Sequence, residues 1–257
     1  LSGAWTPSPL LYVTGALHLG AAAALIARPR IWPWALSAVL AHHVALAAAG
    51  LWPRSQLLGP NWTRLPAQGR STLGVAITID DGPEPSVTPE VLAQRERYQA
   101  RATFFCVGER VLRYPDLAQE IVRRGHTIEN HSQRHRHNFS LLGPSGMRAE
   151  ISLAQESIHR VTASTPIFFR APAGLRNPFL DPILVRLKLR LASWTRRGFD
   201  TVNSDPDAVF KRLTNPLRPG DILLLHDGHA ALSRSGRPVI LEVLPRLLEV
   251  LNAKGLS

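Results

Sequence analysis

Cysteine is almost absent from this chain of 257 residues. The single Cys106 excludes an intrachain disulfide and leaves the redox compartment open, because cytosolic and many periplasmic proteins manage without disulfides. Its neighbours in the run 103–107 are mostly apolar. We therefore expect a buried thiol that behaves as a small hydrophobic side chain.

Acidic residues are the second shortage. The chain has 19 Asp and Glu against 30 Lys and Arg, which gives a formal net charge of +11 at pH 7. Such an excess favours anionic neighbours, among them nucleic acid, acidic lipid head groups and phosphorylated substrates. We expect no nucleic-acid partner, because the sequence has no recognised nucleic-acid module and no aromatic residues interleaved with a basic patch. Nothing in it indicates an obligate protein partner.

Charge is nearly missing from the beginning of the chain, where Arg28 and Arg30 are the only charged side chains up to residue 53. The uncharged segments 10–27 and 31–52 are near the length needed to cross the hydrocarbon of a membrane. We predict two transmembrane helices in a hairpin. A second interpretation is a hairpin that lies in the membrane interface or packs on the rest of the chain. A cleaved signal peptide fits two consecutive apolar segments poorly.

Four tryptophans lie near the ends of these segments, where an amphipathic indole prefers the head-group layer: Trp5, Trp32, Trp34 and Trp52. Basic residues follow both segments, so the orientation of the hairpin stays open. We expect the bacterial inner (plasma) membrane as the location, with the remaining domain at the membrane surface.

From residue 73 onward, strand-like runs alternate with amphipathic helical stretches, which predicts a parallel sheet or barrel of βα units. The strand-like runs are 74–79, 102–107, 126–130, 166–170, 189–194 and 221–226. The helical stretches are 88–99, 109–124, 144–161, 178–188 and 238–253. The chain therefore divides into a membrane hairpin (1–53), a Pro- and Gly-containing linker (54–72) and a large domain (73–257).

Two adjacent carboxylates, Asp80 and Asp81, stand where the first strand-like run ends and a Gly-Pro turn begins. Active sites of βα folds collect at that edge. Close carboxylates repel each other when both are ionised, so one commonly binds a cation while the other is tuned as a base. The alternative is an ordinary turn, because Asp and Gly are frequent turn residues.

His131 and His135 follow another strand-like run. Four residues apart, they fall on one side of a helical turn and can reach one ion together with a carboxylate. One carboxylate and two imidazoles leave a coordination position open for water, which is the catalytic form of a zinc-type site. The alternative is a solvated basic surface. His126 and His137 are interpreted as neighbours.

Two further strand ends carry candidate residues. Arg170 precedes a rigid Ala-Pro turn and can hold a carboxylate bidentately, although alone it would be an ordinary surface arginine. His226 ends the apolar run 221–226. By the period of two, Leu224 shares its face, so an apolar contact and a proton donor can meet one substrate group. His229 is interpreted as a loop residue.

These four motifs, in this order, resemble the polysaccharide deacetylases of carbohydrate esterase family 4, which contain a NodB homology domain. The resemblance covers about residues 73–251 and is specific. It implies a distorted (β/α)7 barrel, here preceded by the hairpin, and a divalent metal, with zinc as the expected ion. It also implies hydrolysis of a carbon–nitrogen bond in a linear amide, that is, carbohydrate N-deacetylation.

The resemblance implies a role for each matching residue. Three residues would hold the metal: Asp81, His131 and His135. Four would be catalytic, with Asp80 as base, Arg170 as its positioning group, His226 as acid and Asp200 as the group that tunes that acid. Three would contact the substrate: Leu224, Ala173 and Trp194. The sequence departs from the family pattern at Ala173, where an aromatic residue is frequent, and at Arg197, where an acid is expected.

A membrane hairpin beside a basic domain indicates a substrate that is itself at the membrane. We expect an N-acetylated sugar on a polyprenyl phosphate, in envelope or lipid A modification, with membrane lipids as neighbours. Basic side chains of the second half could attract phosphate, or be scattered solvated charge: Arg186, Lys188, Arg190, Arg196, Arg197, Lys211, Arg212 and Arg218. The alternatives are a deacetylase of peptidoglycan or exopolysaccharide, and a non-catalytic carbohydrate-binding protein on the same scaffold.

Overall fold

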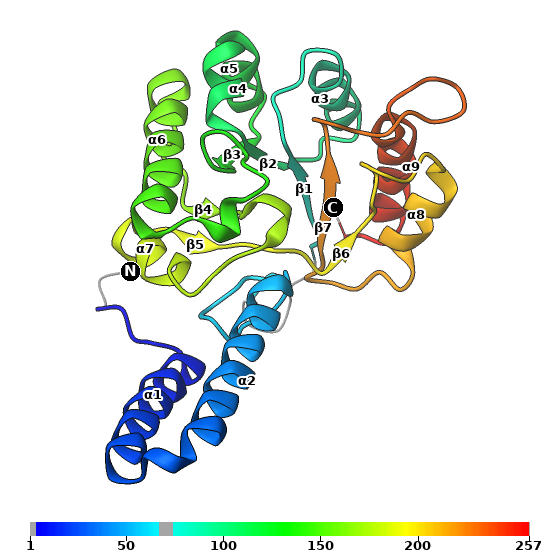
Figure 1. The fold of residues 1–257 in the computed structure, drawn as a ribbon. Helices are drawn as coiled ribbons and strands as arrows, with labels where there is room; N and C mark the ends of the chain where they lie inside the picture. The colour runs from blue at the N-terminus through cyan, green and yellow to red at the C-terminus, as the bar shows by residue number, and fades with distance from the viewer. Residues whose placement is uncertain (1–3, 67–73, 257) are drawn as a thin grey trace.

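The computed structural model describes residues 4–66 and 74–256. Two parts are visible, a helical hairpin and a sheet covered by helices (Figure 1). The last residues of the predicted linker, 67–72, and the predicted domain start at residue 73 lie outside the described residues.

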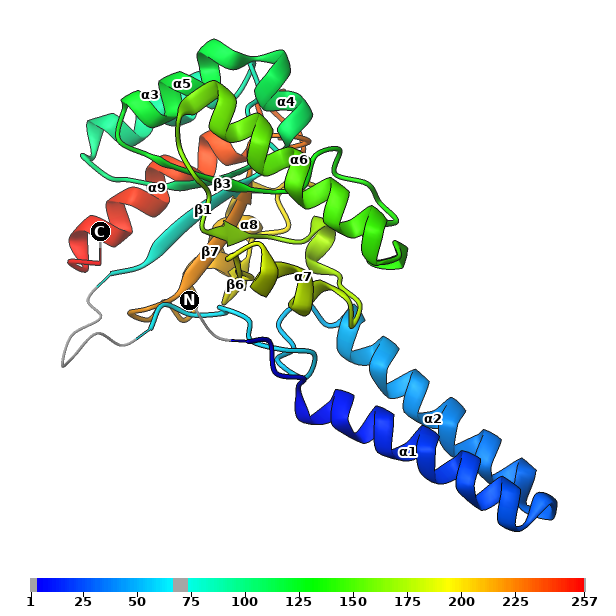
Figure 2. The same ribbon diagram turned by 90° about the vertical axis from the view of Figure 1, so that its left-hand side faces the viewer.

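The hairpin consists of α1 (Pro9–Ala27), a short 3-10 turn η1 (Pro29–Ile31) and α2 (Trp32–Leu51), as the uncharged segments predict. It projects away from the sheet (Figure 2). No residue of α1 is buried, and Ile26 is 84% exposed. Both helices are long and apolar enough to cross a membrane, a test that a signal sequence also passes. Most of the hairpin is exposed, and its buried residues lie near the end of α2, where Leu46 and Ala49 cluster with Leu58 and with Leu10 and Leu11 of α1. A hairpin packed along the domain is therefore not what the described structure shows.

Seven parallel strands form one sheet in the order β5-β4-β3-β2-β1-β7-β6. Their bounds are β1 (Ala76–Asp80), β2 (Thr103–Cys106), β3 (Thr127–Asn130), β4 (Phe168–Phe169), β5 (Arg190–Leu191), β6 (Arg196–Arg197) and β7 (Ile222–His226). Among the described residues no strand pairing joins β5 to β6. The sheet is therefore a curled half-barrel, and the predicted seven-stranded deacetylase-type fold is confirmed.

The connecting helices are α3 (Thr88–Arg97), α4 (Gly108–Arg113), α5 (Pro115–Arg123), α6 (Pro144–Thr162), α7 (Leu180–Arg186), α8 (Pro206–Thr214) and α9 (Val239–Ala253), with short 3-10 turns η2 (Phe139–Leu141) and η3 (Pro172–Gly174). The single helix predicted over 109–124 is wrong. It is split into α4 and α5 at Pro115, which lacks the backbone N–H that a continuous helix needs. Neither β6 nor α8 was predicted from the sequence.

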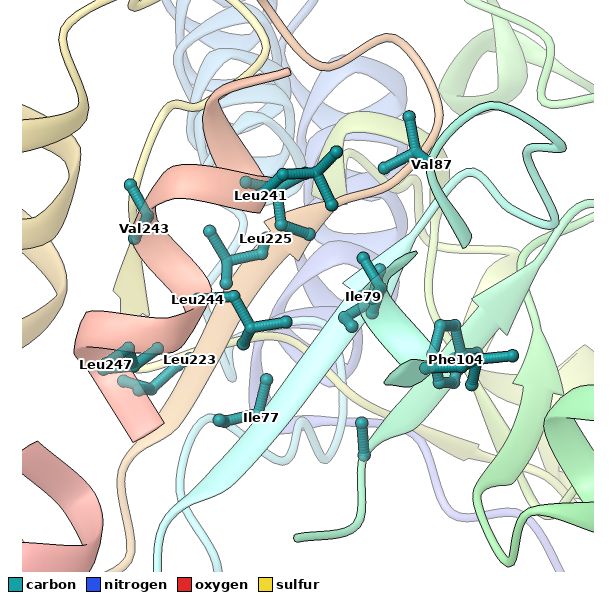
Figure 3. Close-up of a cluster of buried hydrophobic side chains, with 14 of the residues drawn as sticks. Ile77, Ile79, Val87, Phe104, Leu223, Leu225, Leu241, Val243, Leu244 and Leu247 are labelled. Carbon is teal, nitrogen blue, oxygen red and sulfur yellow. The ribbon is translucent and has the colours of Figure 1, made fainter. Parts of the chain in front are cut away.

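Alternation along β1 and β7 separates the core from the site. Ile79 and Leu225 are fully buried in the hydrophobic cluster between the sheet and α9 (Figure 3). Their neighbours Asp80 and His226 pair with each other in register and point to the opposite face. Burial of each such apolar side chain stabilises the fold by about 1.5–3 kcal/mol. A slip of one residue would put the carboxylate and the imidazole into this core, so the apolar residues fix the face of the site.

The described first part of the predicted linker packs on the domain and does not hang free. The Asn61 amide donates to the Pro53 and Ser55 carbonyls at 2.9 and 3.1 Å, and the backbone N–H of Trp62 donates to the Leu191 carbonyl at 2.9 Å. Buried Arg176 donates from its guanidinium to the Ser55 carbonyl at 2.7 Å and from its backbone N–H to α2. These bonds fix the end of the hairpin against the domain.

Candidate active site

A pocket of about 530 Å³ opens at the carboxyl ends of β1, β3 and β7. Asp80 ends β1, and Asp81 follows with a positive φ of 76°, so the two carboxylates leave the strand in different directions. A side chain at Gly228 would collide with Asp81, since a Cβ there would lie 2.6 Å from the Asp81 Cβ. The chain therefore holds Asp81 tightly at the pocket floor.

Asp81 shares this floor with two histidines. The Oδ1 atom of Asp81 lies 3.3 Å from Nε2 of His131 and 3.2 Å from Nε2 of His135. One ligand atom from each residue fits within 4.8 Å of the other two. Oδ1 is buried and has no hydrogen-bond partner. A buried carboxylate oxygen between two imidazole nitrogens, and bonded to neither, fits a site built around a cation.

The histidines offer lone pairs to this site. Nδ1 of His131 lies 2.8 Å from the Arg170 carbonyl, which can only accept, so this nitrogen carries the proton and Nε2 faces Asp81 unprotonated in the neutral ring. Burial, followed by the positive charge of His131, lowers the pKa of His135 to about 4. Neutral imidazoles are the form that ligates a metal.

The electrostatics of the floor also favour a cation. Burial opposes protonation of His131, but Asp80 and Asp81 outweigh it and raise the pKa of this histidine. Burial opposes ionisation of Asp81, yet His131 and His229 lower its pKa well below the usual value. The carboxylates thus attract positive charge, which a divalent ion can supply in place of a proton.

The expectation of a helical turn for the histidine pair is wrong. His131 and His135 lie in a loop in which Ser132 and His135 have positive φ values of 64° and 48°. The Asn130 side chain accepts from the Ser132 N–H at 2.9 Å, and the Ser132 hydroxyl accepts from the His135 N–H at 3.0 Å. These local bonds replace a helical turn and aim both rings at Asp81.

Arg170 connects several parts of the site from a fully buried position. Its guanidinium donates to Oδ1 of Asp80 at 2.6 Å, to the Thr78 hydroxyl at 2.8 Å and to the Ser193 carbonyl at 2.8 Å. It also stacks on Phe105, 4.0 Å from the ring centroid. Oδ2 of Asp80 stays on the side of His131, 3.7 Å from its Nε2. The arginine therefore fixes Asp80 by one oxygen and leaves the other directed at the site.

His226 is held by Asp200, the residue that the resemblance indicates. Oδ1 of Asp200 lies 2.9 Å from Nδ1 of His226, and Oδ2 accepts from the His226 backbone N–H at 2.7 Å. Burial lowers the pKa of His226, but the charge of Asp200 outweighs it and raises the pKa to about 9. Since Nδ1 is occupied by Asp200, the Nε2 proton is the one available to the pocket.

The three predicted substrate contacts all line the pocket. Leu224 and Trp194 are buried, and Ala173 has a positive φ of 55° in η3. Beside it, Gly174 has φ of 74°, and a Cβ there would lie 2.5 Å from the Trp194 ring. Glycine is thus required at this position, both because the φ angle is positive and because a side chain would collide with the Trp194 ring. The structure brings all ten predicted site residues to one pocket or its direct support.

Sequence reasoning missed part of the pocket wall. His229 is a loop residue as predicted, but its Nδ1 lies 3.7 Å from Oδ2 of Asp81. His137 lines the pocket as a neighbour, whereas His126 lies outside it and accepts from the Ala102 N–H at 3.1 Å. Other polar lining residues were not predicted: Glu109, Arg110, Arg113, Arg134 and Thr201. Of the basic residues proposed to attract phosphate, Arg197 alone lines this pocket in the described structure.

Comparison with known proteins agrees with this geometry. A sequence model described as polysaccharide deacetylase matches residues 69–192. The chain is 33% identical to a peptidoglycan-N-acetylglucosamine deacetylase of Bacillus cereus over 175 residues, which cover 67% of this chain and 81% of that protein. The chain belongs to the polysaccharide deacetylase family.

Two further relatives support this assignment. A chitooligosaccharide deacetylase of Azorhizobium caulinodans is 32% identical, with 71% of this chain and 90% of that protein covered. A family 4 carbohydrate esterase from Streptomyces lividans, solved in complex with acetate, superposes with a TM-score of 0.64 at 31% identity, covering 72% of this chain and 90% of that one. This polysaccharide deacetylase is thus a hydrolase of the carbohydrate N-deacetylase class, with a residue group that could hold a metal ion.

Proposed function

We propose that this deacetylase is anchored in the bacterial inner membrane and acts on an amino sugar carried by a polyprenyl phosphate, in envelope or lipid A modification. The contact between the hairpin end and the pocket wall carries this proposal. A Cβ on Gly174 would lie 2.7 Å from the Cβ of Pro53, which follows α2 by two residues. Arg54 donates to the Thr195 carbonyl at 3.2 Å, next to Trp194 of the wall.

Apolar side chains extend along α2 up to this contact. Leu51 and Trp52 are 61% and 60% exposed, and Trp52 stands where an interfacial indole is favoured. With the hairpin in a bilayer, the pocket wall would lie close to the head-group layer. A sugar held to the membrane by its lipid would then be presented directly at the pocket, whereas a wall polymer would have to approach the membrane.

We further propose zinc as the metal, held by Asp81, His131 and His135, because a carboxylate and two neutral imidazoles suit that ion. When bound, the ion polarises the amide carbonyl and makes water acidic enough to attack near neutral pH. All other steps belong to the side chains of the chain itself.

Asp80 would be the base. Its free Oδ2 accepts a proton from the attacking water while Arg170 holds Oδ1 in place. His226 would be the acid: its Nε2 proton passes to the amide nitrogen as the carbon–nitrogen bond breaks, and acetate and a free amine result. Leu224 would contact the acetyl methyl group, and Trp194 and Ala173 would contact the sugar.

The test uses the full chain, reconstituted in lipid vesicles with zinc. Acetate release is measured from polyprenyl-phosphate-linked N-acetylglucosamine in the same vesicles, from isolated peptidoglycan and from a soluble chitooligosaccharide. We expect the highest kcat/KM on the lipid-linked sugar. Asp80→Asn should lower it by about 100-fold or more, the usual contribution of a general base. Asp116→Asn, the same change at an exposed position of α5, is the matched control.

The outcomes separate the parts of the proposal. Preference for peptidoglycan, which the similarity to the B. cereus enzyme favours, would overturn the lipid-linked substrate and leave the deacetylase assignment intact. Equal rates for wild type and Asp80→Asn would overturn the assignment of the base. Extraction of the full chain from cell membranes by alkaline carbonate would overturn the membrane anchor.

A further inference from the structure

Arg197 places a cation without a counterion in the wall of the pocket. Its guanidinium makes no hydrogen bond or ion pair with any described residue, and its Nε is buried without a partner. Burial of part of a charged group with no acceptor is unfavourable unless a ligand provides one. An arginine also stands where the family pattern has an acid, so the local charge of the pocket is reversed at this position.

Two aromatic rings hold this side chain in place. The guanidinium carbon lies 5.5 Å from the centroid of Trp194 and 4.9 Å from that of Phe199. In the sheet, Arg197 pairs with Leu224, which is the proposed contact for the acetyl methyl group. Arg197 is therefore a fixed cation immediately beside the position proposed for the acetamide, and it does not swing freely at the rim.

The other arginines of the wall differ from it. Arg110 forms an ion pair with Glu84, and Arg134 pairs with Glu109 at 3.0 Å. Arg113 has no partner among the described residues, but it is exposed. Arg197 therefore combines a free guanidinium with partial burial and aromatic support.

We propose that Arg197 binds an anionic group on a ring carbon next to the one that bears the acetamide. This inference rests on the proposed function and names its substrate class. In a 2-acetamido sugar, a phosphate at C1 and a carboxylate on an ether at C3 are both vicinal to the acetamide. Either would come within reach of a cation that stands beside the acetyl site in a pocket of about 530 Å³. Arg197 would pair with such a group by a forked, charge-assisted contact.

The test compares three soluble substrates with the full chain in vesicles: N-acetylglucosamine 1-phosphate, the methyl glycoside of N-acetylmuramic acid and the neutral methyl glycoside of N-acetylglucosamine. The measured quantity is kcat/KM for each anionic substrate divided by kcat/KM for the neutral one. Arg197→Gln should lower this ratio about 10- to 100-fold, the range for a lost charge-assisted hydrogen bond. Arg197→Lys should restore part of it, because the charge remains and the fork is lost.

Arg212→Gln is the matched control. Arg212 stacks on the same ring, 5.3 Å from the Phe199 centroid, but it is exposed and does not line the pocket. We expect its substitution to leave the ratio unchanged. Binding gives a second readout: in the Asp80→Asn background, Arg197→Gln should raise the Kd for N-acetylglucosamine 1-phosphate about 10-fold or more by calorimetry.

The two anionic substrates identify the source of the charge, since loss on the phosphate alone assigns a sugar phosphate and loss on the muramic acid alone assigns a carboxylate. Equal loss of kcat/KM on all three substrates, or no loss on either anion, would overturn the inference. Absence of acetate release by the wild type from every substrate, including those of the preceding section, would instead overturn the proposed function.

Discussion

Replacement of Asp200 by Asn tests whether this carboxylate makes His226 an acid. Asn has nearly the same shape, and its amide oxygen can still accept from Nδ1 of His226, but the charge is lost. The charge of Asp200 is the largest cause that raises the pKa of His226, and burial lowers that pKa. Once the charge is removed, the effect of burial is opposed much less. The pKa of His226 should then fall from about 9 toward its ordinary value of 6.5, because Asp80 and Asp81 still favour the charged form.

The expected loss of activity follows from the protonated fraction of His226. At pH 8, a group with a pKa of about 9 is mostly protonated, whereas one with a pKa of about 6.5 is mostly not. If the pKa falls that far, kcat/KM should drop about 30-fold. The deficit should shrink as the pH is lowered toward 6, because both proteins are then largely protonated. A bound divalent ion would lower the pKa in both proteins, so their difference is the tested quantity.

The assay is acetate release from a chitooligosaccharide between pH 5 and pH 10, with kcat/KM plotted against pH for each protein. The alkaline limb of the profile reports the essential acid of the free enzyme. Asp205→Asn is the control: it makes the same change at the exposed residue that caps the beginning of α8, and it should leave the alkaline limb of the profile where it is in the wild type. An Asp200→Asn profile that is lowered equally at every pH, with its alkaline limb unmoved, would refute the reasoning.

Three other predictions concern stability, the pocket wall and the metal. Burial and nearby arginines lower the pKa of His126 to about 4, so the folded state binds this proton more weakly than the unfolded chain. The stability that this histidine allows above about pH 6.5 is therefore lost as the pH falls toward 4. In urea unfolding, His126→Asn should reduce that loss by about 1–2 kcal/mol after allowance for solvent screening. Gly174→Ala should destabilise the fold by about 1–3 kcal/mol in the same assay and lower kcat/KM, whereas Gly146→Ala, with its nearest contact at 3.8 Å, should do neither. Chelation of the metal should abolish acetate release, and added zinc should restore it. His135→Ala should reduce the amount of bound zinc measured by mass spectrometry, and unchanged zinc content would exclude this residue as a ligand.

Much of the fold could be predicted because its strands are buried on both sides and read as apolar runs. The run 221–226 contains β7, which begins one residue later, and the run 74–79 overlaps β1, which begins two residues later and ends one residue later. β6 was missed because Arg196 and Arg197 form no apolar run, and their strand conformation depends on pairing with β7. α8 was predictable in principle, since Asp205 caps it and a proline follows at its first position.

The residues of the site could be predicted from the sequence, but most of its geometry could not. Asp81 follows β1, whereas His131 and His135 follow β3, and only β2 separates these two strands in the sheet. Parallel strands bring their carboxyl ends to one edge of a sheet, so the motifs could be expected to meet there. The contribution of Asp200 depended on the family resemblance, because its side chain reaches His226 across a sequence separation that no local pattern spans. The aromatic support of Arg197 was not predicted, although Trp194 and Phe199 lie within three residues of it in the sequence, because the sequence does not show which way these side chains turn.

The part that no sequence rule could supply is the backbone of the site. Local rules assign positive φ to glycine, yet Asp81, Ser132, His135, Ala173 and His229 all adopt it. Each such residue costs of order 1–3 kcal/mol in strain and persists only where its surroundings fix it. Here the surroundings are the buried hydrogen bonds and close backbone contacts that aim carboxylate and imidazole groups at one point. The fold therefore overrules local propensity where these side chains converge on one point. For this reason the sequence pattern could identify the residues but not their backbone conformation.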